Sequence, residues 1–166
     1  LYFIYKIITT INLSEQLKSE YPEYNFVPIY WMASEDHDFE EINHVHLFGD
    51  KLAWKQEQEG AVGVMSTESL KSLFDELKII LGDSKEAEDL YHLFSDSYLG
   101  NKDLAAATRY LVNALFSKYG LVVLDAGTLN LKKEAISLIK RDVLEQSNYP
   151  LIQQVNKDLG RVQAFA

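Results

Sequence analysis

Apolar residues recur with helical spacing in several segments of this chain, and this spacing predicts most of its secondary structure. Isoleucine and leucine return at near-helical intervals within residues 2–19, as on one face of an amphipathic helix. The same spacing predicts further helices over residues 70–81, 85–94, 104–116 and 131–145. Ser66 or Thr67 would cap the first of these, and the last would resume to Leu159 after Pro150.

Two short apolar runs predict strands at the centre of the fold. Residues 26–32 form one run, in which Tyr30 and Trp31 are expected in the core, although one of them could instead flank a ligand. Residues 121–124 form the other, a continuous run typical of a parallel strand covered on both faces. Further extended segments are predicted at residues 45–48, 51–54 and 60–64, the first two joined as a hairpin through Gly49 and Asp50. This order of helices and strands predicts an α/β fold with a layered, parallel-sheet core.

Composition narrows the class of protein. The 166 residues are 47% hydrophobic and carry a net charge of −9, which suits a packed domain and argues against a nucleic-acid-backbone binder. The chain has no cysteine, so it can form neither a disulfide framework nor a thiolate zinc site. No apolar run approaches the roughly 20 residues that span a bilayer, so no membrane partner is predicted and a cytoplasmic location is expected.

Acids and histidines gather directly after the first predicted strand. Glu35, Asp36, His37 and Asp38 follow it, and Asp125 follows the strand at residues 121–124. Ligands of open α/β sheets bind beyond the carboxyl ends of the strands, so these side chains could face one crevice. A carboxylate beside an imidazole can hold an ammonium group or relay a proton, and carboxylates can bind Mg²⁺. The pattern therefore predicts an acidic site at this edge.

Two other interpretations of the same residues remain open. Asp36 or Asp38 could only cap a short helical turn at residues 39–42, in a non-catalytic scaffold whose acids keep the chain soluble. Alternatively, the chain could be a metal-dependent hydrolase in which imidazoles and a carboxylate bind zinc. The zinc ligands would then come from His37, Asp38, His44 and His46, although no HExxH arrangement is present.

Three segments resemble a known family. The segments LYFIYKIITTINL, FVPIYWMASEDHDFEEINH and YGLVVLDAG resemble, in this order, parts of the cysteine-adding enzyme family of bacillithiol biosynthesis. The resemblance implies a Rossmann-like core related to class I aminoacyl-tRNA synthetases and nucleotidylyltransferases, with a connecting-peptide insertion. It places the first part of the core at residues 1–64, a helical insertion at 65–102 and the second part of the core at 103–166.

The resemblance also implies a reaction. Members are thought to join L-cysteine to the amino group of glucosaminyl malate in the last step of bacillithiol formation. Such an amide bond requires an activated carboxylate, so ATP is expected as cofactor, through an acyl-adenylate or an acyl-phosphate, and Mg²⁺ is possible. A VVTGQQ strand before Leu1 and a long coiled coil, through which a homodimer could form, are absent from this chain. The chain is therefore interpreted as a core fragment that is inactive alone and leaves apolar surface exposed near residues 1–11.

Site residues follow from this interpretation. Asp36, His37 and Asp38 are predicted to be catalytic, with Asp36 or Asp38 binding an ammonium group. His37 is predicted to transfer a proton or to stabilise the transition state. The predicted substrate-binding residues are Glu35, Asn43, His44 and Asp125. No residue is assigned to a metal.

Overall fold

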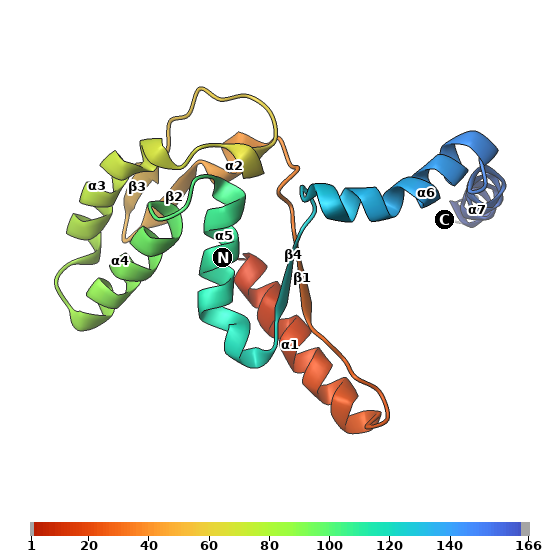
Figure 1. Cartoon of the computed structure of the whole chain (residues 1–166), viewed down its shortest axis with the longest axis horizontal. Helices are drawn as coiled ribbons and strands as arrows, with labels where there is room; N and C mark the ends of the chain where they lie inside the picture. Colours follow the sequence, from red (N-terminus) through yellow and green to blue (C-terminus); the bar gives the residue numbers. More distant parts are fainter. Residues whose placement is uncertain (1, 164–166) are drawn as a thin grey trace. The chain divides into compact units, whose positions relative to one another are not determined.

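The computed structural model describes residues 2–163 of the chain, with side chains described to residue 160. By their internal contacts the residues form two compact units, Leu1–Gly127 and Thr128–Ala166. The first unit holds all the strands found in the described residues, together with the helices α1 to α5 (Figure 1). The second holds the helices α6 (Leu129–Glu145) and α7 (Tyr149–Gln163).

The centre of the first unit is a pair of parallel strands. Helix α1 (Tyr2–Glu20) leads into β1 (Ile29–Met32), which pairs with β4 (Val122–Asp125) in register from Ile29 with Val122 to Met32 with Asp125. The two predicted strands are therefore present and parallel. The first begins later than expected, and Pro28, which lacks an N–H, only accepts a bond from the Val122 N–H at 3.0 Å.

Helices α1 and α5 (Leu104–Phe116) cover one face of these strands (Figure 1). The buried side chains of this first apolar cluster are Ile7, Ile11, Val112, Phe116 and Leu121, and Tyr30 and Val123 pack against them. On the other face Trp31 is 62% exposed, so its assignment to the core was wrong. Successive side chains of a strand point to opposite faces, and Tyr30 occupies the covered one. Val122 is also exposed, so β4 is not covered on both faces as predicted.

A second apolar cluster includes residues on either side of an antiparallel hairpin, Phe39 before it and Trp54 after it. A single helical turn, α2 (Phe39–Ile42), precedes β2 (His44–Leu47) and β3 (Asp50–Ala53). The turn between the strands consists of Phe48 and Gly49, both with positive φ, one residue earlier than predicted. The buried side chains of the second cluster are Trp54, Val62 and Met65. Residues 60–64 were predicted to be extended, but Val62–Val64 form a 3-10 turn, η1.

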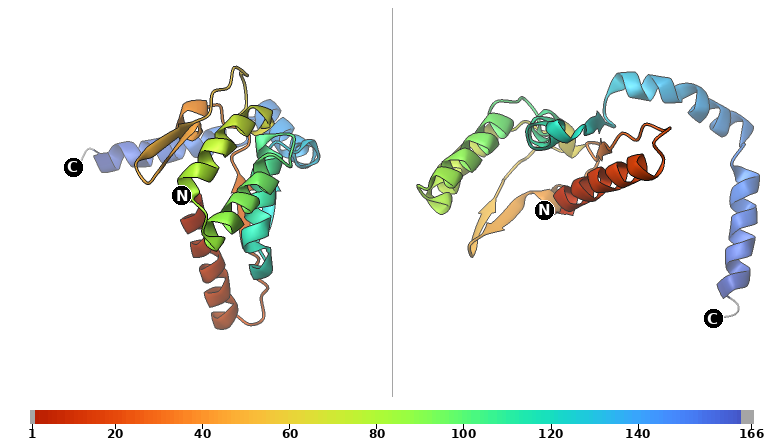
Figure 2. Two further views of the ribbon diagram at one scale, coloured as in Figure 1. Left: turned by 90° about the vertical axis from the view of Figure 1, so that its left-hand side faces the viewer. Right: turned by 90° about the horizontal axis from the view of Figure 1, so that it is seen from below.

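Three helical segments complete this region. They are η2 (Glu68–Leu70), α3 (Lys71–Leu81), which contacts β3, and α4 (Lys85–Tyr98) (Figure 2). Helix α4 is one turn longer than predicted. Neither Ser66 nor Thr67 caps α3: the Thr67 hydroxyl donates to the Asn101 carbonyl at 2.7 Å, and the Ser66 hydroxyl accepts from the Glu68 N–H at 3.3 Å. Leu73 packs on the second cluster rather than on the parallel strands β1 and β4. The helical insertion at residues 65–102 stays a prediction.

Helix α5 belongs to both apolar clusters. Its first residue, Leu104, packs on the second cluster, whereas Val112 and Phe116 lie in the first. Asp103 caps the helix by accepting a hydrogen bond from the Ala106 N–H at 2.8 Å. Because the helix starts at one cluster and ends at the other, it fixes the hairpin region relative to the parallel strands.

In the second unit the large apolar side chains that the structure describes are exposed rather than packed in a core. Leucine, isoleucine and valine recur along α6 and α7, yet none of the apolar side chains described there is buried. Leu129, Val143 and Leu144 are each about 70% exposed. Among the helices of residues 2–163, none is long and apolar enough to cross a membrane.

Candidate functional site at the carboxyl edge of the sheet

The carboxyl ends of β1 and β4 are joined by side chains. Ser34, two residues beyond β1, is only 8% exposed, and its hydroxyl donates a short hydrogen bond to Oδ1 of Asp125, the last residue of β4. The Gly127 N–H donates to the same Oδ1 at 2.9 Å and to the Ser34 Oγ at 3.1 Å. These bonds close a small ring that fixes the distance between the two strand ends.

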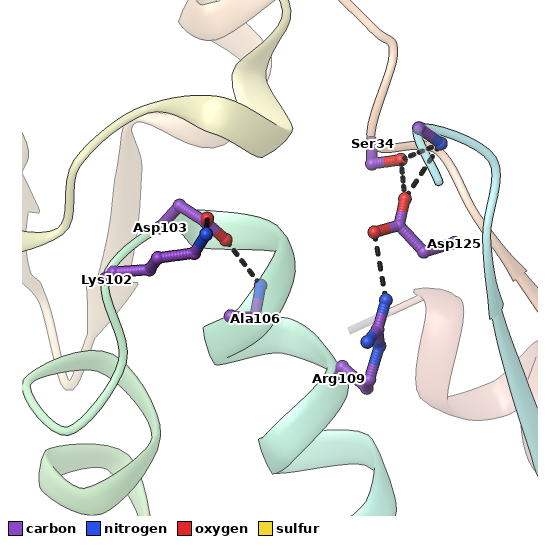
Figure 3. Close-up of polar contacts among 7 residues, drawn as sticks. Ser34, Lys102, Asp103, Ala106, Arg109 and Asp125 are labelled. Atoms are coloured by element: carbon purple, nitrogen blue, oxygen red, sulfur yellow. Dashed lines mark hydrogen bonds and ion pairs between the residues drawn. The ribbon is translucent and has the colours of Figure 1, made fainter. Parts of the chain in front are cut away.

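Arg109 supplies the counter-charge to this ring (Figure 3). It projects from the middle of α5, and its Nη2 donates to the other carboxylate oxygen of Asp125, Oδ2, at 3.0 Å. The Asp125 side chain is 14% exposed, whereas that of Arg109 is 50% exposed. Ser34, Arg109, Asp125 and Gly127 are called the carboxyl-edge cluster below. The cluster places an ion pair of unequal exposure where ligands of α/β sheets bind.

A second backbone segment lies against Ser34. The Gly63 N–H donates to the Ser34 carbonyl at 3.0 Å, and the Val62 N–H donates to the Asp36 carbonyl at 2.7 Å. A Cβ on Gly63 would lie 2.5 Å from the Ser34 carbonyl oxygen, so only glycine permits this approach. The segment η1 therefore holds the chain in place as it leaves β1.

The predicted catalytic residues follow in an exposed loop. The side chains of Glu35, Asp36, His37 and Asp38 all face solvent. Oδ1 of Asp36 accepts from the Asp38 N–H at 3.0 Å, and Oδ1 of Asp38 accepts from the Glu41 N–H at 3.3 Å. The expected capping of the turn at residues 39–42 is therefore confirmed for Asp38. A cap uses one oxygen of the carboxylate, so it leaves the other for chemistry.

His44 and His46 belong to β2 of the hairpin, and Asn43 directly precedes this strand at the end of α2. Nδ1 of His44 lies 2.8 Å from Oδ1 of Asn43, and the His44 and His46 rings meet edge to face with their centres 5.5 Å apart. Among the described residues, no three His, Asp or Glu side chains are placed to hold a metal ion. The zinc-hydrolase interpretation therefore finds no ligand set in this part of the chain.

The structure brings only one predicted site residue, Asp125, into the carboxyl-edge cluster. Its partners Ser34 and Arg109 were missed. Ser34 lies 91 residues before Asp125, and Arg109 lies 16 residues before it. One signal was available for Arg109, because it is the single arginine in the sequence of residues 1–127 and stands on an apolar helix. The roles predicted for Asp36, His37 and Asp38 stay predictions.

Comparison with known proteins identifies the family. The family described as "Bacillithiol biosynthesis BshC, N-terminal Rossmann-like domain" matches residues 1–165. The chain belongs to this family. The predicted α/β fold with a Rossmann-like core is thereby confirmed, as is the resemblance found in the three segments.

Relatives in the BshC family are much longer than this chain. A protein of Flavobacterium psychrophilum named "Putative cysteine ligase BshC" is 56% identical over 158 residues, which cover 95% of this chain and 30% of that protein. A protein of the same name from Flavobacterium johnsoniae is 50% identical over 96% of this chain and 30% of its own length. One from Staphylococcus haemolyticus is 30% identical over 93% of this chain. The chain thus spans about a third of the relatives it matches.

Proposed function

We propose that this chain is part of a ligase that joins L-cysteine to the amino group of glucosaminyl malate, the last step of bacillithiol formation. The observation that carries the proposal is the family match over residues 1–165, together with relatives named as cysteine ligases. The site described above is compatible with this reaction, since it presents carboxylates, an imidazole and a guanidinium at the edge where α/β sheets bind ligands.

The exposed loop supplies the groups that the reaction requires. The attacking amine must lose its proton, and a carboxylate of Asp36 or Asp38 would hold the ammonium group of a substrate beforehand. His37 lies between them in the sequence and would take up the proton as a general base. Glu35, Asn43 and His44 would support substrate binding. The bonds of Asp36 and Asp38 to the loop backbone favour one loop conformation before the substrate arrives.

Activation of the cysteine carboxylate would come from ATP. When bound, ATP supplies the free energy for replacing a carboxylate oxygen by the amine nitrogen. Mg²⁺ commonly uses one or two protein carboxylates and keeps several waters. The exposed carboxylates of Asp36 and Asp38 are suited to such partial coordination.

The test measures bacillithiol in cells whose own gene is replaced by full-length variants. Asp36→Asn and His37→Ala should each lower bacillithiol about tenfold or more, because each removes a group that contacts an ionic substrate. Glu41→Gln is the matched control: it lies in the same acidic segment, and only its backbone N–H has a bond to the loop. Thermal unfolding of each variant reports whether the fold is intact.

Two outcomes would contradict these roles. Near-normal bacillithiol in both variants would remove the loop from the mechanism and leave Asp38 as a cap. An equal loss in Glu41→Gln would indicate that general acidity of the segment, and not these particular groups, matters. Absence of bacillithiol formation by the unmodified full-length protein would reject the function itself.

A further inference from the structure

The carboxyl-edge cluster contains the Arg109 guanidinium, and the bond to Asp125 occupies only part of its hydrogen-bonding capacity. Arg109 forms a hydrogen bond to Asp125 through Nη2, and half of its side chain remains exposed. A guanidinium carries several N–H donors arranged as a planar fork, so donors remain for a second anion.

Asp125 is engaged on both sides of its carboxylate. Oδ1 accepts from the Ser34 hydroxyl and the Gly127 N–H, and Oδ2 accepts from Arg109. The carboxylate is also largely buried, so little of it is open to a ligand. A substrate approaching this edge would therefore meet the guanidinium before the carboxylate. Asp125 is better placed to orient Arg109 than to bind an ammonium group itself.

We propose that Arg109, oriented by Asp125, binds an anionic group of a substrate at the carboxyl edge of β1 and β4. The group is a carboxylate or a phosphate, since both match the guanidinium fork with two parallel hydrogen bonds. The proposal deepens the proposed function and rests on it for the choice of ligands, because the malate part of one substrate and the phosphates of ATP carry such groups. Asp125, Ser34 and Gly127 act as positioning residues.

Charge supports this assignment. The chain carries 25 acidic and 16 basic residues, and three of the acidic ones, Glu35, Asp36 and Asp38, lie in the loop beside the cluster. An anionic substrate would be repelled by such an edge unless a cation were placed there. Arg109 supplies a cation at this edge, and the hydrogen bond from its guanidinium to Asp125 restricts the conformations of its side chain.

The experiment measures binding to the full-length protein by titration calorimetry. Two pairs of ligands are compared: glucosaminyl malate with methyl glucosaminide, which lacks the malate, and ATP with adenosine. Arg109→Gln should weaken binding of the anionic member of one pair about tenfold or more and leave binding of its counterpart, which lacks the anionic group, unchanged. A loss for glucosaminyl malate identifies a carboxylate as the bound group, and a loss for ATP identifies a phosphate.

Control variants separate binding from charge and folding. Lys71→Gln removes the same charge from an exposed position at the start of α3 and should bind all four ligands normally. Arg109→Lys keeps a cation beside Asp125 but loses the fork, so it should fold normally and bind the anionic ligand with an intermediate affinity. Thermal unfolding is recorded for every variant.

The proposal is overturned if Arg109→Gln binds glucosaminyl malate and ATP as the unmodified protein does, or if binding of methyl glucosaminide and adenosine weakens equally. It is also overturned if the unmodified protein binds neither glucosaminyl malate nor ATP. Failure of the proposed function is separate: Arg109-dependent binding in a protein that forms no bacillithiol would uphold the anion site and reject the ligase reaction.

Discussion

Asp125 lies at the same edge of the sheet as Asp36 and Asp38, but different contacts hold its side chain in place. Asp125 is largely buried and bonded to a hydroxyl, a backbone N–H and a guanidinium from three separate segments. Asp36 and Asp38 are exposed, and the bonds found for their side chains go to backbone N–H groups two and three residues further along the chain. The Asp125 side chain is therefore held by the tertiary fold, whereas the side chains of Asp36 and Asp38 are held by bonds within their own loop, whose backbone is bonded at Asp36 to the Val62 N–H.

The difference suggests a division of roles. Groups that must keep their position are placed on regular elements and supported by a second layer of bonds, as Asp125 is. Groups that must adjust to a substrate are commonly placed on loops supported by a rigid scaffold. Substitutions in the two sets should therefore differ in kind: those around Asp125 should cost stability, and those in the loop should cost mainly activity.

The largest effect is expected at Gly63. A methyl group in Gly63→Ala would lie 2.5 Å from the Ser34 carbonyl oxygen and 2.7 Å from its Cβ, so backbone must shift. We expect the unfolding free energy to fall by about 3 kcal/mol or more, at or above the upper end of the usual range for overpacked sites, because the atoms in the way include backbone. Chemical denaturation measures this change.

Gly160→Ala is the matched control, because no atom lies within 4 Å of the added methyl group. It should be neutral or stabilise α7 by about 0.5–1 kcal/mol. Equal stability of Gly63→Ala and Gly160→Ala would contradict the close contact between Gly63 and Ser34.

The next effect concerns the hydroxyl of Ser34. Ser34→Ala removes one donor to the partly buried, charged Asp125, and bonds to charged groups contribute about 1.5–3 kcal/mol. Ser14→Ala removes a partly buried bond to the neutral Phe26 carbonyl, at 2.9 Å, and should cost only about 0.5–1.5 kcal/mol. Denaturation of the two variants side by side tests whether charge makes the difference. A larger loss for Ser14→Ala would contradict the importance assigned to the carboxyl-edge cluster.

The smallest change in stability is expected in the loop. Asp38→Ala removes the cap of α2, a single exposed turn, and should cost about 0.5–1 kcal/mol. Asp38→Asn keeps an oxygen acceptor for the Glu41 N–H and should restore most of that stability. If Asp38 also acts in the proposed reaction, Asp38→Asn should remain defective in bacillithiol formation although its stability is restored. Full activity of Asp38→Asn would identify capping as the role of this residue.

Local features of the fold could be predicted from the sequence, and features that depend on distant packing could not. The helical turn at residues 39–42 and its cap by Asp38 involve neighbouring residues, so the pattern was sufficient. The parallel pairing followed from two apolar runs. The exposure of Trp31 depends on which face the helices cover, and an alternating strand gives no indication of that. The 3-10 turn at Val62–Val64 is associated with backbone bonds to Ser34 and Asp36, far away in sequence.

The same reasoning applies to the candidate site. Asp125 could be placed at the edge because it directly follows a strand. Its use as the partner of a serine and an arginine could not be predicted, since residue spacing does not specify which side chains meet across 91 positions. The roles of Asp36, His37 and Asp38 remain predictions because they depend on a bound substrate.

Helix α5 has a consequence for how the first unit unfolds. Leu104 at its start belongs to one apolar cluster, and Val112 and Phe116 near its end belong to the other. Loss of either cluster removes packing from the same helix, so the two clusters are expected to open as one cooperative unit rather than as separate subdomains. Arg109 stands between these anchors. The Arg109 guanidinium therefore lies on a helix whose local unfolding is energetically costly. Thermal motion of the hairpin alone is not expected to move it.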